Sequence, residues 1–192
     1  MNTSDTNRRS FLKTVATGTA GAAVTGMMIS DASGATPSTT QAAEFRRAFG
    51  DLWNRIASYT VDVARAMPEE HYDYKPTADV RSFKEEMLHI AASDFWINNY
   101  FGEGLGTGDD YGAEGKSKAD CVSLMEASFE NMSGVIAGLS DEQLHTNVET
   151  FAGEMNRMSV LWFMRDHITH HRAKAVVYLR MNGVEPPGYV GS

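Results

Sequence analysis

Two histidines near the C-terminus have the spacing of metal ligands on a helix. His167 and His171 are four residues apart in a segment whose apolar residues recur every three to four positions. Residues four apart share one helix face, so both imidazoles would lie on the core side, whereas His170 would point away. Neutral imidazole is the commonest metal ligand in proteins, and two rings one turn apart can bind one cation. Hydrogen bonds within the core are the alternative explanation for both residues.

His89 is the candidate for a third ligand. It lies in the middle of a second, strongly apolar segment, on a side shared with Ala92, Ser93 and Trp96. Three imidazoles would leave coordination positions open for water or substrate, which is typical of a catalytic rather than a structural site. Zn²⁺, Ni²⁺ and Fe²⁺ all suit imidazole, so the ligand type predicts a divalent metal ion without choosing among them.

A di-iron site is the main alternative for histidines buried in a helical bundle. Glu86 precedes His89, and Glu142 precedes His145, with the Glu-x-x-His spacing of such sites. Glu142, however, belongs to a predicted helix cap, where it would be solvated. The segment that carries His167 supplies no inward-facing glutamate. The carboxylate count therefore favours the three-histidine site.

Other reactive side chains could assist the site. Cys121 could be a fourth ligand or a redox thiol, although a single cysteine is more often a small apolar core residue. Glu85 or Glu86 could orient a ligand or act as a base, and a capping position already accounts for Glu85. Asp94 and Tyr178 are polar residues that could line the site. His71 and His145 lie in connecting segments and are expected to be exposed.

Four segments with helical periodicity would hold these side chains in place. The second begins with a capping box at Ser82 and is apolar nearly all round, which predicts a central, buried helix. The fourth ends at Gly183, where a left-handed cap is favoured, and Pro186 and Pro187 follow. We therefore expect an all-α four-helix bundle. Its helices are predicted over residues 42–67, 82–101, 117–139 and 159–182.

The connections between these segments differ in composition. Residues 102–115 are rich in glycine and are expected to form a loop, because glycine disfavours a helix. Ser140 begins another capping box, which predicts at most a short helix. Residues 146–157 show no strand-like alternation and are predicted to be irregular.

The first 35 residues predict an export signal. Arg8 and Arg9, followed by Ser-Phe-Leu-Lys, resemble the twin-arginine motif, with Asn7 in place of the usual serine or threonine. An uncharged stretch follows over residues 14–30, and a small-residue cleavage site ends at Ala35. The motif implies recognition by the twin-arginine export machinery, which exports folded proteins, often with a cofactor loaded. We expect a periplasmic or extracytoplasmic location after cleavage, or else an uncleaved membrane anchor.

Composition agrees with one folded domain behind this signal. The 192 residues are 42% hydrophobic and 22% charged, which is typical of a globular protein. A net charge of −8 argues against a nucleic-acid-binding surface, and a single cysteine excludes a disulfide framework and a cysteine-cluster zinc site. The predicted order is a signal peptide over residues 1–35, a linker over 36–41, the bundle over 42–189 and a tail over 190–192.

Two longer motifs contain the three histidines. Residues 75–101 read KPTADVRSFKEEMLHIAASDFWINNYF, and residues 167–189 read HITHHRAKAVVYLRMNGVEPPGY. Together they resemble the DinB-like superfamily of small four-helix-bundle proteins, which includes damage-inducible proteins and thiol-dependent transferases. The likeness extends over nearly all of the predicted bundle. It implies a divalent metal site formed by His89, His167 and His171.

This resemblance implies enzymatic functions and leaves non-enzymatic alternatives. A metal-dependent hydrolase or a thiol transferase would act on a small-molecule substrate, by ionising a water or a thiol that attacks an electrophile. Export argues against the thiol reaction, because small thiol cofactors are mainly cytoplasmic. The alternatives are a metal-binding or stress-related bundle without turnover, and an interaction module that has lost the metal. Bundles of this kind often pair, so a homodimer is a further expectation.

Overall fold

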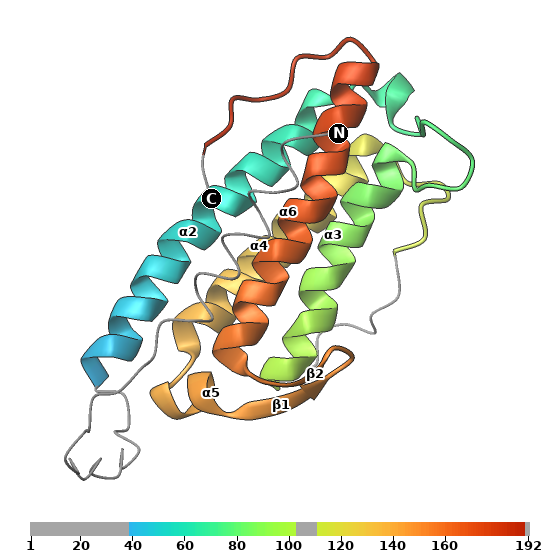
Figure 1. Ribbon diagram of the computed structural model, residues 1–192. Helices are drawn as coiled ribbons and strands as arrows, with labels where there is room; N and C mark the ends of the chain where they lie inside the picture. The colour runs from blue at the N-terminus through green and yellow to red at the C-terminus, as the bar shows by residue number, and fades with distance from the viewer. Residues whose placement is uncertain (1–38, 103–110, 191–192) are drawn as a thin grey trace, which may run out of the picture. The chain divides into compact units, whose positions relative to one another are not determined.

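Four long helices make up most of the described chain (Figure 1). The computed structural model describes residues 39–102 and 111–190, without the side chains of residues 39–40, 94–96 and 98. The predicted export signal and the glycine-rich residues 103–110 lie outside this range. The long helices are α2 (Thr39–Ala66), α3 (Phe83–Asn98), α4 (Lys118–Gly138) and α6 (Arg157–Met181).

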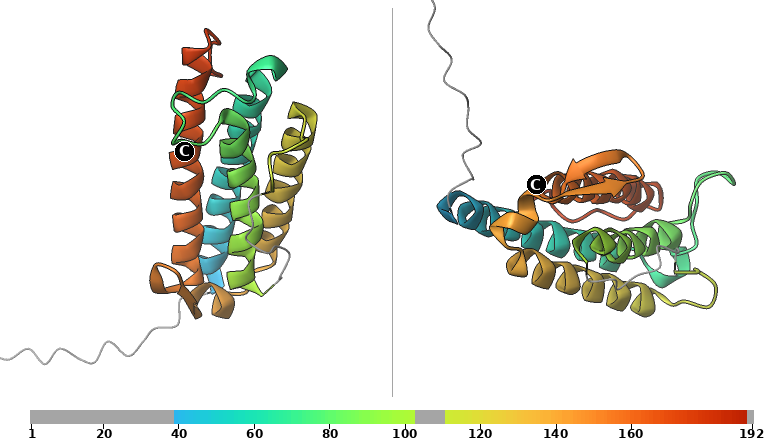
Figure 2. Two further views of the ribbon diagram at one scale, coloured as in Figure 1. Left: turned by 90° about the vertical axis from the view of Figure 1, so that its right-hand side faces the viewer. Right: turned by 90° about the horizontal axis from the view of Figure 1, so that it is seen from below.

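These helices form a bundle in which α3 lies next to α6. Both α2 and α3 contact α4 and α6, so the order around the bundle is α2, α4, α3, α6. The chain runs in opposite directions along α3 and α6, and in the same direction along α3 and α4 (Figures 1 and 2). The predicted all-α four-helix bundle is therefore confirmed. None of the described helices combines the length and the apolar character needed to cross a membrane.

The sequence signals at the ends of α3 and α6 are confirmed. The backbone N–H of Ser82 donates to the Glu85 carboxylate at 2.6 Å, and the N–H of Glu85 donates to the Ser82 hydroxyl at 3.2 Å. At the end of α6, the N–H of Val184 donates to the carbonyl of Leu179 at 2.9 Å. Gly183 closes this turn with a φ of +71°, a conformation that glycine adopts without strain.

The connection between α4 and α6 is more regular than predicted. A short helix α5 (Asp141–His145) begins with the expected capping box. The prediction that residues 146–157 are irregular is wrong, because they contain the antiparallel strands β1 (Asn147–Thr150) and β2 (Gly153–Asn156). Both strands are short and contain no fully buried residue, so their sequence lacks the apolar alternation by which a strand is recognised. Two 3₁₀ turns, η1 (Glu69–His71) and η2 (Asn99–Phe101), complete the described elements.

Aromatic side chains of α2 occupy the centre of the core. Phe49 and Trp53 are buried, and their rings stack with centroids 6.5 Å apart. Trp53 also packs edge-on against Phe129 of α4 at 5.3 Å, and its indole N–H donates to the Phe129 carbonyl at 3.2 Å. Trp53 therefore links two helices through both apolar contact and a hydrogen bond.

Replacement of this tryptophan should show how strongly the core depends on it. Trp53→Ala should lower the free energy of unfolding by about 3–5 kcal/mol, because it leaves a large cavity. Trp162→Ala is the matched control: Trp162 contacts Phe45 and Phe49 but is 44% exposed, so its loss should be about 1 kcal/mol. Urea unfolding monitored by circular dichroism would measure both, and equal losses would contradict this description of the core.

Candidate metal site

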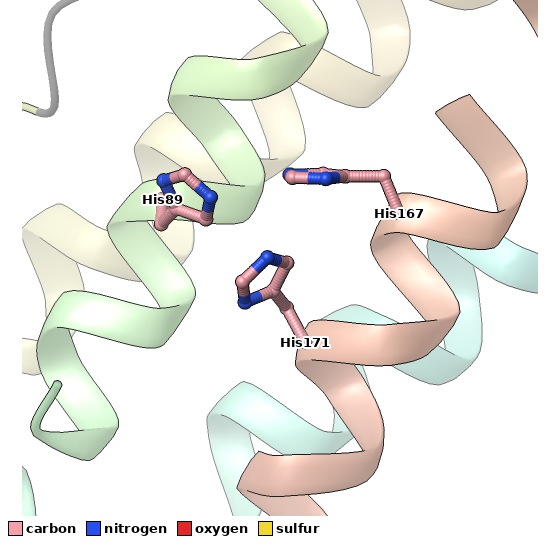
Figure 3. A group of neighbouring side chains, drawn as sticks. All are labelled: His89, His167 and His171. Atoms are coloured by element: carbon pink, nitrogen blue, oxygen red, sulfur yellow. The ribbon is translucent and has the colours of Figure 1, made fainter. Parts of the chain in front are cut away.

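Three histidine rings meet between α3 and α6 (Figure 3). His89 extends from α3, and His167 and His171 extend from α6, so that the rings point toward one another. One ligand atom from each residue lies within 4.8 Å of the other two. The ring centroids are 5.0 Å apart for His89–His167, 4.4 Å for His89–His171 and 4.5 Å for His167–His171. The three residues predicted from the sequence are thus brought together, close enough to hold one metal ion.

The local folding of α6 explains why these histidines converge. His167 and His171 are one turn apart on the face that packs against α3, and the neighbouring Ile168 is fully buried. His171 is 5% exposed, whereas His89 and His167 are half-buried. His170 is exposed and lies outside the group, as predicted. The cluster is therefore accessible from one side and anchored in the core on the other.

Glu86 holds His171 in position. The Nδ1–H of His171 donates to Glu86 Oε2 at 2.5 Å, and the Glu86 side chain is almost completely buried. This bond leaves the lone pair of His171 on Nε2, the nitrogen available to a metal. Burial opposes ionisation of Glu86, but the hydrogen bond from His171, together with the charges of Lys174 and Arg81, outweighs it and lowers the Glu86 pKa.

Ser93 makes a second polar contact with the cluster. Its hydroxyl donates to the backbone carbonyl of His89 at 2.6 Å and lies 2.8 Å from Nε2 of His167. Because a hydroxyl has one hydrogen, His167 Nε2–H is the donor in this arrangement, and the lone pair of His167 is on Nδ1. Coordination through Nε2 would therefore require the contact with Ser93 to open. The sequence placed Ser93 on the same side as His89 but gave no sign of this bond.

The surroundings of His167 keep it neutral. Burial, followed by the proximity of His171 and His89, lowers the pKa of His167 to about 4. On the side away from His171, the Phe163 ring lies 6.5 Å from the His167 ring and packs against Phe151 of the hairpin turn at 5.5 Å. Sequence reasoning missed the contact between Phe151 and Phe163, because it depends on the unpredicted hairpin.

The other reactive residues proposed from the sequence lie elsewhere. Within the described residues the group contains neither cysteine nor carboxylate. Cys121 is buried in α4, and burial raises its pKa to about 11. Glu142 and His145 are exposed on α5, so no di-iron site is assembled there. His71 is half-buried in η1 rather than exposed.

Four other residues singled out from the sequence have different outcomes. Glu85 takes the capping role expected of it, and Glu86 takes the site-orienting role. The side chain of Asp94 is outside the described part of the structure. Tyr178 follows His171 on the same face of α6 and is 6% exposed.

Comparisons with known proteins agree with this fold. Residues 43–191 match the DinB family. The chain is 26% identical over 134 residues to the uncharacterized protein YjoA of Bacillus subtilis strain 168, an alignment that covers 68% of this chain and 86% of YjoA. The solved structure of YjoA, 24% identical, has a TM-score of 0.61 and covers 74% of this chain and 97% of its own. A DinB-like protein of Bacillus cereus ATCC 10987, 18% identical, has a TM-score of 0.67 with coverage of 74% and 96%.

The fold and the histidine cluster together define a DinB-like helical bundle with a potential metal site. The family match extends over most of the chain and includes His89, His167 and His171. The chain belongs to the DinB family.

Proposed function

We propose that this protein binds one divalent metal ion through His89, His167 and His171, and that the metal serves small-molecule chemistry at an open site. The main support for this proposal is that three imidazoles from two helices converge, and that the buried carboxylate of Glu86 fixes the imidazole of His171. Zn²⁺, Ni²⁺ and Fe²⁺ are the candidate ions, since all three bind imidazole well.

The donor set fits such an ion. A histidine must be neutral to coordinate a metal, and the lowered pKa of His167 satisfies this condition at neutral pH. The hydrogen bond between His171 and Glu86 has the arrangement in which a carboxylate orients a ligating histidine and raises its basicity. Three protein ligands leave room for a further molecule, and the partial exposure of His89 and His167 gives that molecule access.

A bound divalent cation would supply Lewis acidity, which polarises a carbonyl or favours ionisation of a water or a thiol. The residues of the chain would orient the site: Glu86 fixes the His171 ring, and Ser93 contacts the His167 ring. Hydrolysis of a small molecule and transfer of a thiol are the two reaction classes that use this chemistry. If the protein is exported, as its N-terminal motif predicts, hydrolysis is the better supported of the two.

A metal-binding or stress-related bundle without turnover is the second candidate. It is favoured by the environment of Glu86, the carboxylate in contact with the cluster. Glu86 accepts a hydrogen bond from His171 and pairs with Lys174 at 3.6 Å. A carboxylate engaged in this way is poorly suited to act as a general base, because accepting a proton would disrupt both contacts.

Metal binding should require each of the three histidines. Wild-type protein should bind about one equivalent of Zn²⁺ or Ni²⁺, and His89→Ala, His167→Ala and His171→Ala should each weaken binding by at least about 100-fold, since a ligand matters more than a residue that supports one. His170→Ala, an exposed histidine on the same helix, is the control and should bind like wild type. Equilibrium dialysis with elemental analysis measures this, and unchanged binding in the three cluster variants would exclude the site.

Loss of charge at Glu86 should weaken the metal site without removing it. Glu86→Gln should lower metal affinity by about tenfold, because the uncharged amide is a poorer acceptor for the His171 N–H. Glu85→Gln is the matched control, as Glu85 is the adjacent residue but caps α3 and pairs with Lys75. Cobalt titration followed by visible absorption would compare the variants, with circular dichroism to confirm folding. If Glu86→Gln and Glu85→Gln bind cobalt with equal affinity, Glu86 supports the fold and does not tune the metal site.

Catalysis should depend on the same cluster. Metal-loaded wild type should hydrolyse activated esters or amides, or conjugate a thiol, and His167→Ala should lose at least about 100-fold in rate, as expected when Lewis-acid assistance is removed. A panel of chromogenic esters, amides and thiol acceptors measures this. If wild type binds metal but is as inactive as His167→Ala throughout, the non-catalytic candidate replaces the enzymatic one.

A further inference from the structure

The two polar neighbours of the histidine cluster contact different nitrogens of their histidines. Glu86 accepts a hydrogen bond from the Nδ1–H of His171, and this bond leaves Nε2 of that ring available. The Ser93 hydroxyl instead lies 2.8 Å from Nε2 of His167. Glu86 and Ser93 therefore affect the availability of the Nε2 atoms in opposite ways.

Nε2 is the nitrogen through which His167 would reach a metal ion shared with the other two rings. In a histidine side chain, Nε2 is at the edge of the ring farthest from the backbone, and Nδ1 is next to the atom that joins the ring to Cβ. The three rings point toward one another, so their outer edges face the centre of the cluster (Figure 3). Ser93 thus contacts His167 at the atom that the proposed metal site requires.

A second hydrogen bond determines what the Ser93 hydroxyl can do at this atom. The hydroxyl donates its single hydrogen to the backbone carbonyl of His89 at 2.6 Å, so toward His167 it acts as an acceptor. Ser93 is 7% exposed, which restricts the access of water that could replace either bond. In this arrangement Nε2 of His167 carries a hydrogen and has no lone pair for a metal.

We propose that Ser93 competes with the metal ion for Nε2 of His167 and thereby regulates how tightly the site binds metal. The inference rests on the proposed function and adds a regulatory residue to it. Only one of the two hydrogen bonds of Ser93 has to break, since the bond to the His89 carbonyl does not involve His167. When it breaks, the proton moves from Nε2 to Nδ1 by exchange with water, so the ring stays neutral and no net proton is released.

Removal of the Ser93 hydroxyl should strengthen metal binding. Ser93→Ala has no bond to break at His167, so it should bind Zn²⁺ about three- to tenfold more tightly than wild type, the range expected for one net hydrogen bond. Glu86→Gln should change the affinity in the opposite direction, because it removes an orienting contact rather than a competing one. Competition titration of the full-length protein with a zinc chelator measures the affinities, and circular dichroism confirms that each variant is folded.

Ser133→Ala is the matched control. The Ser133 hydroxyl donates to the carbonyl of Phe129 at 2.9 Å, four residues earlier in the helix, as the Ser93 hydroxyl does to that of His89. Ser133 belongs to α4, which carries none of the three histidines. Its replacement removes the same type of bond within a helix and should leave zinc affinity unchanged.

The protonated nitrogen of His167 provides a readout that requires no metal. In metal-free wild type at neutral pH, the ring nitrogen chemical shifts should show that Nε2 of His167 carries the hydrogen and Nδ1 does not. In Ser93→Ala the Nε2–H loses its acceptor, and the shifts should move toward those of a mixture of the two tautomers. Ser133→Ala should give the wild-type shifts.

The direction of the change in affinity separates this proposal from its alternatives. Equal zinc affinity in Ser93→Ala and wild type, or a hydrogen on Nδ1 of His167 in metal-free wild type, would overturn the competition. Weaker binding in Ser93→Ala would also overturn it, and would mean that Ser93 orients His167 for coordination through Nδ1. If neither protein takes up metal, the metal site is rejected and the competition with it, whereas metal uptake that Ser93→Ala does not strengthen rejects the competition alone.

Discussion

The hydrogen bond between Glu86 and His171 is the contact on which the organisation of the site depends. A carboxylate that is 1% exposed is costly to bury unless it is paired and hydrogen-bonded, and this bond, with the nearby Lys174, satisfies it. The bond joins α3 to α6, so it constrains how the two helices face each other. It also determines which nitrogen of His171 is available to a metal. One buried contact therefore connects the packing of the bundle with the chemistry proposed for it.

The rest of the bundle supports this contact. The capping box at Ser82 determines where α3 begins. Glu86 and His89 are three residues apart on this helix and therefore lie one turn apart on it. On the opposite side of α6, Arg172 donates to the Thr60 hydroxyl at 3.1 Å, and its guanidinium lies over the Tyr59 ring at 4.7 Å. These contacts fix α6 to α2. The histidine face of α6 is thereby held toward α3 rather than rotated away from it.

Much of this arrangement could be predicted from the sequence, because it depends on helical spacing. The i, i+4 relation of His167 and His171, the exposure of His170 and the helix caps are local properties, and all are confirmed. The proximity of His89 is not local; its prediction rested on family resemblance and on its position in a buried helix. The β-hairpin was missed because its strands are short and contain no fully buried residue.

The sequence patterns did not predict the side-chain contacts between segments that are distant along the chain. The bond between Ser93 and His167 joins residues 74 positions apart, and nothing in the pattern of either helix specifies it. The segment before α3 and the helix α6 line one groove, to which they contribute Arg81 and Lys174, and this depends on loop conformation, which composition does not determine. Sequence periodicity thus predicts which residues share a helix face, whereas side-chain partners across helices require the tertiary structure.

Anomalous diffraction from crystals of the zinc-loaded protein would show whether His89, His167 and His171 bind one metal ion together. We expect one strong zinc peak between α3 and α6, about 2.0–2.1 Å from one nitrogen of each of His89, His167 and His171. His171 should coordinate through Nε2, with its Nδ1 still bonded to Glu86. A zinc peak at another place, or a zinc ion bound by fewer than three of these histidines, would contradict the account.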